Sequence, residues 1–387
     1  MGDASRRRKP LAAGAARPRR RSSWARLVVL VGVSGLGACS SGTTTPEGAA
    51  TSSATGGGAM STDASSGEIA ASSSAFAGGG ASVGTGGSGG AATGAGGSSG
   101  DGGGAAEPLP PCPSFGGPAL QGLVLNTSIK EASGLAASRK NPSVLYVHND
   151  SGDSPRVFAM NSMGGYLATY AFGGAKATDW EDIAVGPGPT AGESYLYVGD
   201  IGDNGESRDD VRIYRVAEPK VDAGVMLATL TLDAVETFTF VYPDGPHNAE
   251  TLLVDPLTGD VHIVVKDGGG TSPVFRAKAP LSSSGKTTLK QIASFAFGQD
   301  PLPGGKSTTG GDISPDGSLV AVRTYTSAFA WRRAKGATIE DALKTAPCKI
   351  PISAGGQGET LGFAADGKGY FSLNEGTFQP LNFYAKK

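Results

Sequence analysis

The sequence predicts an all-β protein folded as a β-propeller of five four-stranded blades, with six blades as the alternative count. From residue 119 onward, short apolar runs alternate with turn clusters, and helical periodicity is nearly confined to residues 338–343. An acid-led strand followed by further strands recurs at intervals of roughly 47 to 69 residues, as propeller blades do. The last unit lacks a strand, which the segment 120–125 can supply. The ring is therefore expected to close with an N-terminal strand.

The first 38 residues predict an export signal. They carry nine Lys or Arg residues and one acid, and the apolar run 27–31 is too short to span a membrane. The sequence Leu36-Gly37-Ala38-Cys39 resembles the lipobox of bacterial lipoproteins, in which the cysteine receives a diacylglycerol. Cys39 is the predicted lipidation site, and a plain secretory signal with an accidental cysteine is the alternative.

Residues 39–107 are composed mostly of Gly, Ser, Ala and Thr, with five acids and no base. Such a segment is expected to be a flexible tether with a span on the order of 45 Å. It would carry the propeller domain, residues 108–387. The exported part has a net charge near -10, which excludes a general nucleic-acid binder because that function requires a basic surface.

The two remaining cysteines, Cys112 and Cys348, lie near the start and the end of the predicted propeller. In an exported protein this arrangement predicts a disulfide, with two free thiols as the alternative. The bond would join the two ends that close the ring.

Each predicted blade begins with an inner strand that opens on an acid and is followed by three further strands. The opening acids are Glu131, Glu181, Glu250, Asp312 and Glu359. Second strands are expected at 144–147, 195–198, 261–264, 319–322 and 369–372, and third strands at 157–159, 212–214, 274–276, 329–331 and 381–384. Fourth strands are expected at 166–172, 236–241, 292–297 and 349–352.

The five opening acids predict a cation site in the central channel. Inner strands line that channel, so Glu131, Glu181, Glu250, Asp312 and Glu359 are expected to converge and to repel one another unless a cation or a base offsets them. Hard oxygen ligands favour calcium over zinc. In the alternative interpretation these acids accept hydrogen bonds from backbone amides at blade junctions, or pair with bases such as Lys130, Lys266 and Arg323.

The loops after the second strands occupy the same place in every blade and should share one face of the ring. They supply a predicted polar ligand pocket at the channel mouth. Its expected members are Asn149, Asp200, Asp203, Asn204, Lys266, Tyr325, Asn374 and Glu375.

The blade pattern, with turns such as Ser314-Pro315-Asp316-Gly317, resembles bacterial extracytoplasmic propellers of the TolB-like and esterase-like-phytase kind over residues 119–387. That resemblance implies either a binding module or a calcium-dependent phosphoesterase or lactonase. The first expectation is a monomeric cell-surface lipoprotein that binds a small molecule, glycan or protein through its acidic channel face, together with calcium. Ser40 after the lipidated cysteine favours the outer membrane.

Two alternative functions remain open. The first is a metal-dependent hydrolase of a phosphoester, ester or lactone, in which Glu131, Glu181 and Glu250 hold the ion. In this mechanism His148 or Asp150 activates water, and Arg323 stabilises the developing anion. The second is a structural envelope protein that needs neither a metal nor a pocket.

Overall fold

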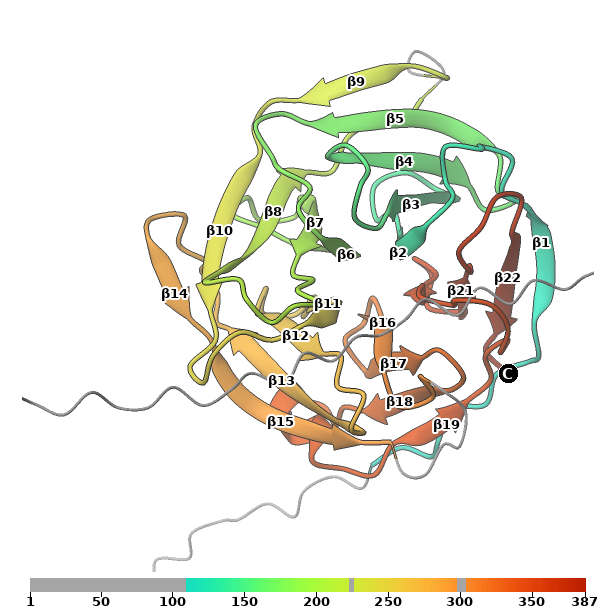
Figure 1. The fold of residues 1–387 in the computed structure, drawn as a ribbon. Coiled ribbons are helices and arrows are strands. Elements are labelled where there is room, and N and C mark those ends of the chain that lie inside the picture. Colours follow the sequence, from blue (N-terminus) through green and yellow to red (C-terminus); the bar gives the residue numbers. More distant parts are fainter. Residues whose placement is uncertain (1–108, 223–225, 298–303) are drawn as a thin grey trace, which may run out of the picture. The chain divides into compact units, whose positions relative to one another are not determined.

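The computed structural model describes residues 109–222, 226–297 and 304–387, which form five β-sheets arranged in a ring around a central axis (Figure 1). They belong to one compact unit, Gly96–Lys387. The predicted five-bladed propeller is confirmed. The predicted signal peptide, Cys39 and the whole of the predicted tether lie outside the described residues.

The first three blades follow one another along the chain. Blade 1 contains β2 (Ala132–Ala137), β3 (Val144–Asn149), β4 (Arg156–Asn161) and β5 (Tyr166–Phe172). Blade 2 contains β6 (Trp180–Pro187), β7 (Ser194–Asp200), β8 (Val211–Ala217) and β10 (Glu236–Val241). Blade 3 contains β11 (Ala249–Val254), β12 (Val261–Val265), β13 (Thr271–Ala277) and β15 (Lys290–Ala296).

Blade 4 contains β16 (Thr308–Ile313), β17 (Leu319–Thr324), β18 (Ala328–Arg332) and β19 (Cys348–Ile350). Blade 5 contains β20 (Gly362–Phe363), β21 (Gly369–Ser372) and β22 (Pro380–Ala385), and its fourth strand is β1 (Ala119–Leu123). β1 pairs antiparallel with β22, with Ala119 opposite Phe383. The predicted closure of the ring by an N-terminal strand is therefore confirmed.

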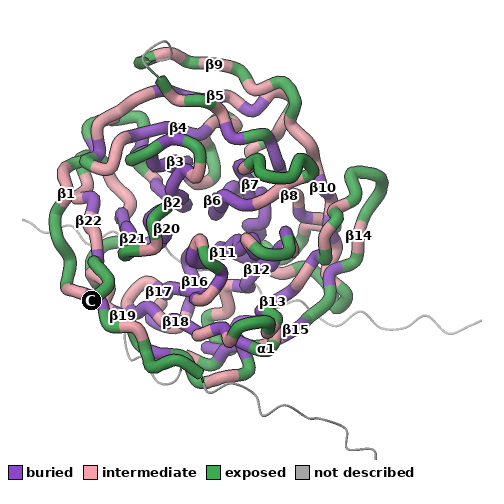
Figure 2. The backbone as a smooth tube through the Cα atoms, turned by 180° about the vertical axis from the view of Figure 1, so that it is seen from behind, coloured by how far each residue is buried: buried purple, intermediate pink, exposed green. Residues whose placement is uncertain are grey.

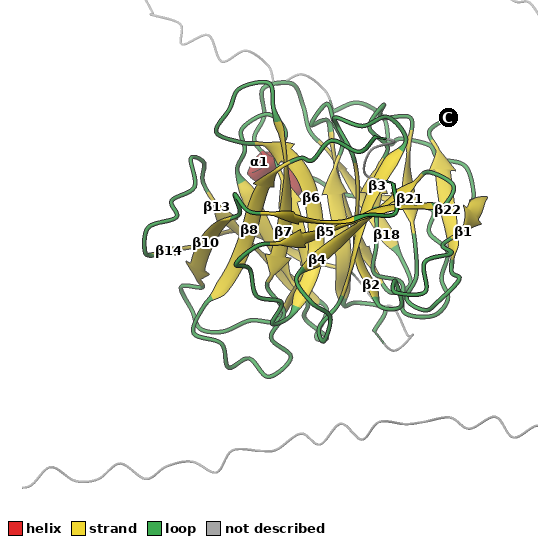
Figure 3. Ribbon diagram, turned by 90° about the horizontal axis from the view of Figure 1, so that it is seen from above, coloured by secondary structure: helices red, strands yellow, loops and turns green. Residues whose placement is uncertain are grey.

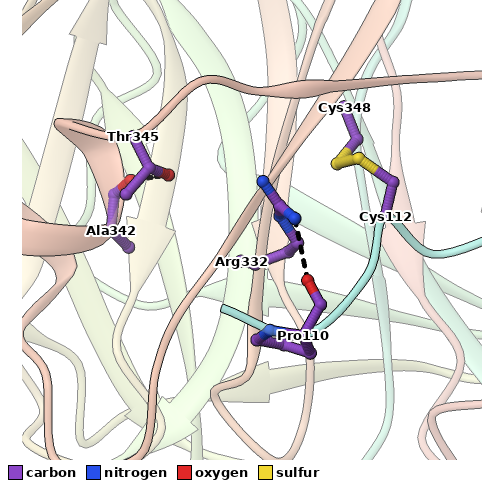
Figure 4. Close-up of a disulfide and its surroundings, with 6 residues drawn as sticks. All are labelled: Pro110, Cys112, Arg332, Ala342, Thr345 and Cys348. Carbon is purple, nitrogen blue, oxygen red and sulfur yellow. Dashed lines mark hydrogen bonds between the residues drawn. A yellow bond between two sulfur atoms is a disulfide. The ribbon is translucent and has the colours of Figure 1, made fainter. Parts of the chain in front are cut away.

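The predicted disulfide between Cys112 and Cys348 is present, with 5.7 Å between the two Cα atoms (Figure 4). Cys348 opens β19, the outer strand of blade 4, whereas Cys112 precedes β1 of blade 5. Beside the bond, Arg332 donates a hydrogen bond of 2.8 Å to the carbonyl oxygen of Pro110. The crosslink holds the entering chain against blade 4 just before that chain joins blade 5.

The inner strands β2, β6, β11 and β16 are buried at nearly every residue, because both faces of each blade pack on neighbouring blades (Figure 2). Hydrophobic clusters fill the spaces between blades. One of them joins Tyr197 and Phe238 of blade 2 to Leu252 and Phe275 of blade 3. Side-chain packing between sheets thus holds the inner strands around the axis.

Two strands were not predicted. β9 (Thr229–Leu232) and β14 (Lys286–Thr288) add parallel to the outer edges of blades 1 and 2. Both are short and largely exposed, so the apolar pattern carries little signal for them.

The predicted helical segment contains α1 (Ile339–Leu343), which Thr338 caps together with Asp341 (Figure 3). Among the residues that the structure describes, no helix is long and apolar enough to cross a membrane.

Candidate functional site

Each inner strand contains a one-residue irregularity at the same level of the channel. In blades 1 to 4 the strand register shifts at a single residue near the start of the inner strand. In blade 5 the bridge between Gly358 and Asn374 and the bonds between Thr360 and Leu373 place the extra residue at Glu359. The five equivalent residues are Ser133, Glu181, Glu250, Thr309 and Glu359. A β-bulge of this kind changes the direction of one side chain in each blade, so the five bulges together define a ring of equivalent side-chain positions.

Three of the five acids predicted for the channel ring occupy bulge positions, namely Glu181, Glu250 and Glu359, and all three are buried. The placement of Glu131 differs from the prediction. It lies two residues before the bulge of blade 1, is half exposed, and pairs with Lys130 at 3.7 Å. The presence of an acid at the start of an inner strand was not enough to identify the side chain that points into the channel. The bulge changes the alternation of side chains along the strand, so the sequence pattern alone gives the wrong residue.

Asp312 also departs from the predicted ring, since it lies three residues beyond the bulge of blade 4. Its carboxylate accepts hydrogen bonds of 2.8 Å from the backbone N–H groups of Ile313 and of Phe363 in blade 5. Asp182, which the sequence pattern did not single out, bridges blades 2 and 3 in the same way by accepting from Leu252 N–H at 2.9 Å. For Asp312 the alternative interpretation, a hydrogen bond to backbone amides at a blade junction, is the correct one.

The residues that follow the second strands gather at one mouth of the channel. In chain order they are Asp150, Ile201, Lys266, Tyr325 and Glu375, each directly after a residue paired with the inner strand. The prediction that these loops share one face is confirmed by this common register.

A hydrogen-bonded chain crosses blades 3 to 5 at the mouth. Lys266 Nζ contacts the Glu250 carboxylate and donates to the Tyr325 hydroxyl at 2.9 Å, and that hydroxyl donates to Glu359 at 3.2 Å. The second carboxylate oxygen of Glu250 is buried and has no hydrogen-bond partner among the described residues. The Glu359 carboxyl also forms a side-chain hydrogen bond with Glu375. This half of the mouth therefore holds one ammonium group among three buried or partly buried carboxyls.

A second group of carboxylates lies on blades 1 and 2. Oxygens of Asp150, Asp179 and Glu181 all lie within 4.8 Å of one another. Gly202 packs against both Asp179 and Glu181, and a Cβ atom at this position would collide with their carboxylates. Glycine at 202 thus permits the two acids to approach. Asp179 was not predicted from the sequence, although its position two residues before Glu181 was the available signal.

The pKa values at the mouth are raised, which reflects crowding of buried like charges. Burial, followed by the charge of Asp150, raises the pKa of Asp179 to about 6. Burial and the neighbouring Glu250 raise the pKa of Glu181 well above its ordinary value. Burial and Glu359 raise the pKa of Glu375 to about 8. The folded protein therefore disfavours the ionised form of these carboxyl groups, since burial and neighbouring carboxylates outweigh the nearby positive charges.

Several residues predicted to line the ligand pocket instead form hydrogen bonds or ion pairs that hold the loops in place. Asn149 accepts from Lys130 N–H at 3.0 Å and from Glu131 N–H at 3.2 Å. Asp200 is fully buried and pairs with Arg208 at 2.9 Å. The Asp203 carboxylate accepts a hydrogen bond from Ser207 N–H, and the Asn204 side-chain oxygen accepts one from the Asn248 side chain. The Asn374 side chain donates a hydrogen bond to Gly355 O. These five residues shape the mouth, whereas Lys266, Tyr325 and Glu375 line it.

Two residues assigned to the hydrolase mechanism are inaccessible in the structure. His148 is fully buried, lies edge-on to Trp180 at 5.8 Å, and has a pKa lowered to about 4 by burial. Arg323 is also fully buried and donates to Thr360 O at 3.1 Å and to Ser372 Oγ at 3.0 Å, between blades 4 and 5. Neither side chain has a surface available to a substrate, and burial explains both departures from the expected roles.

No protein-family model matches the chain, and no curated protein matches it in sequence. Among solved structures, one described as the structure of U3-55K is 10% identical with a TM-score of 0.37, covering 68% of this chain and 97% of that chain. The RRP9 WD40 repeats are 11% identical with a TM-score of 0.37, covering 71% of this chain and all of that chain (100%). Similarity at this level carries no conclusion about function, and the strand order of the chain itself defines its five blades.

Proposed function

We propose that the propeller is a binding module that takes up a ligand at the acidic mouth of its channel through a divalent cation, calcium, held by Asp150, Asp179 and Glu181. The observation that carries this proposal is the mutual approach of the three carboxylates within 4.8 Å. Carboxylate oxygens are ligands that calcium prefers. Bound calcium would offset the burial and the repulsion between carboxylates that together raise the pKa values of Asp179 and Glu181.

The number of protein ligands favours a role in binding over a purely structural one. Calcium takes six to eight oxygen ligands, and three carboxylates leave coordination positions for water or for oxygen atoms of a ligand. The partly exposed carboxyl group of Glu375 lies at the same mouth and can form hydrogen bonds with hydroxyl groups of that ligand. A small molecule or glycan rich in hydroxyl groups has this chemistry.

The test is calorimetric titration of the EDTA-treated full-length protein with calcium and with magnesium. We expect calcium binding with a dissociation constant on the order of 10⁻⁴ to 10⁻³ M, the range of extracellular calcium modules. Asp179→Asn should weaken it at least ~10-fold, since a ligand is lost. The matched control is Asp209→Asn, which neutralises an exposed acid on a neighbouring loop.

Two results would contradict the proposal. One is the absence of any calcium heat or thermal shift in the wild-type protein. The other is equal calcium affinity in Asp179→Asn and the control variant, which would place any binding elsewhere.

The metal-dependent hydrolase has less support than the binding module. Its expected water-activating His148 and anion-stabilising Arg323 are fully buried. Asp150 remains accessible, but here it belongs to the proposed calcium ligands. Hydrolysis would thus require groups other than those the sequence pattern suggested.

We also propose that the chain is a lipoprotein of the bacterial envelope anchored through Cys39. The support is the sequence Leu36-Gly37-Ala38-Cys39 after a basic and apolar segment. In a bacterial host, metabolic labelling with a palmitate analogue should mark the wild-type protein, and Cys39→Ser should remove the label and shift the protein from the membrane to the soluble fraction. Persistence of the label in the variant would refute the assignment.

A further inference from the structure

The opposite end of the channel carries a second polar site of different charge. The turns between inner and second strands lie there, because antiparallel strands place successive loops at opposite ends of a blade (Figure 3). A cavity of about 450 Å³ opens among these turns and is lined by Arg139, Lys140, Glu193, Pro256 and Pro315. This end is separate from the acidic mouth.

The Arg139 guanidinium has an unused hydrogen-bond donor. Its Nη1 atom is buried and has no partner among the described residues. The nearby charged groups are already engaged. Lys140 pairs with Glu193 at 3.4 Å, and Asp366, which lines the adjoining groove, pairs with Lys368 at 3.3 Å. The Asp312 carboxylate, on which Arg139 acts electrostatically, accepts two backbone N–H groups. A charged donor without an acceptor is unfavourable, and Arg139 as a whole is only partly buried and lines the cavity, so its guanidinium is suited to an anionic group that enters from outside.

The turn that carries Arg139 is held rigidly by the buried carboxylate of Glu218. That carboxylate accepts from the Ser138 hydroxyl, from Arg139 N–H at 3.3 Å and from Lys140 N–H at 3.4 Å. The Asn141 side chain adds a hydrogen bond of 2.9 Å to Pro219 O. The backbone positions of both cations are therefore fixed before any ligand arrives, which lowers the entropy loss on binding.

Arg139 and Lys140 also line an adjoining groove of about 510 Å³ between blades 1 and 5. The apolar part of its wall comes from Val144, Leu145, Ala364, Phe371 and Phe383. Phe371 and Phe383 pack against each other with 4.8 Å between ring centroids. A charged guanidinium at one side of an apolar groove matches a ligand with an anionic head and an apolar body.

We propose that this face is a binding site for a carboxylate that carries an apolar chain or ring. The carboxylate accepts hydrogen bonds from Arg139, and the apolar part lies in the groove over Phe371 and Phe383. The site does not depend on the proposed calcium site, because none of its residues belongs to the acidic mouth.

The test is isothermal titration of the full-length protein with octanoate, with acetate and with inorganic phosphate. We expect octanoate to bind, and acetate and phosphate to bind at least ~10-fold more weakly because they lack the apolar part. Arg139→Gln should weaken octanoate binding at least ~10-fold, since one charged hydrogen bond is lost. The matched control is Lys349→Gln, which removes an exposed cation from β19.

A second variant, Ala365→Trp, fills the groove from an exposed position and should also abolish octanoate binding while calcium titration at the other mouth stays unchanged. The proposal is overturned if octanoate does not bind the wild-type protein. It is overturned equally if Arg139→Gln and Ala365→Trp both retain wild-type affinity, or if acetate or phosphate binds as tightly as octanoate.

Discussion

Removal of the disulfide between Cys112 and Cys348 should destabilise the propeller strongly, because the bond closes a very long loop. The two cysteines are 236 residues apart. In the chain-entropy model, a loop of this length restricts the unfolded chain by about 5 kcal/mol at 25 °C. Native packing between β1 and β22 remains in the absence of the bond, so the folded state is expected to survive with a lower free energy of unfolding.

The assay is urea unfolding at equilibrium, followed by far-ultraviolet circular dichroism, for the wild type and for Cys112→Ala, Cys348→Ala and the double variant. All three variants should lose the same free energy of unfolding, since either substitution removes the crosslink. The wild type under reducing conditions should match them. The loss should approach the chain-entropy value of about 5 kcal/mol.

A loss below ~1 kcal/mol in the double variant would refute the reasoning, because it would mean that the unfolded chain gains little freedom when the crosslink is absent. Unequal losses in the single variants would show that packing of the individual side chains, rather than loop closure, dominates the effect.

Two further predictions concern buried positions in the blades. Gly310→Ala places a methyl group against the carbonyl oxygen of Glu359 and should lower the free energy of unfolding by about 1–3 kcal/mol. The control, Gly117→Ala, meets no atom within 4 Å and should change this free energy by less than ~0.5 kcal/mol. Equal effects of the two variants in urea unfolding would contradict the close packing of blades 4 and 5. Burial lowers the pKa of His262 to about 4, so between pH 6.5 and pH 4 only the unfolded chain takes up this proton and stability falls with falling pH. The free energy of unfolding of the wild type should therefore drop by about 2 kcal/mol more than that of His262→Gln between pH 7 and pH 5, and parallel pH profiles would exclude a buried neutral imidazole.

The fold could be predicted from the sequence because each blade repeats a local pattern. The apolar runs that become β3, β7, β12, β17 and β21 were located within a few residues of their observed bounds, since turn residues such as Asp316 and Gly317 separate them. β9 and β14 were missed because a short edge strand with one exposed face has no strong apolar pattern.

The candidate site could be predicted only in part. Glu181, Glu250 and Glu359 were found because each opens an inner strand in the sequence pattern. Glu131 and Asp312 fit the same pattern but lie two residues before and three residues beyond the bulge. A one-residue bulge moves every following side chain to the other face, and its position depends on pairing with the second strand.

By itself, the sequence determined the all-β class, the five repeats, the closing N-terminal strand and the pairing of the two cysteines. These features depend on local periodicity and on residue types that act over a few positions. Only the tertiary structure decided which acids meet at the mouth, that Asp179 joins them, and that His148 and Arg323 are buried. These features depend on contacts between blades far apart in the chain, where burial and strand register, rather than residue type, determine which side chains remain accessible.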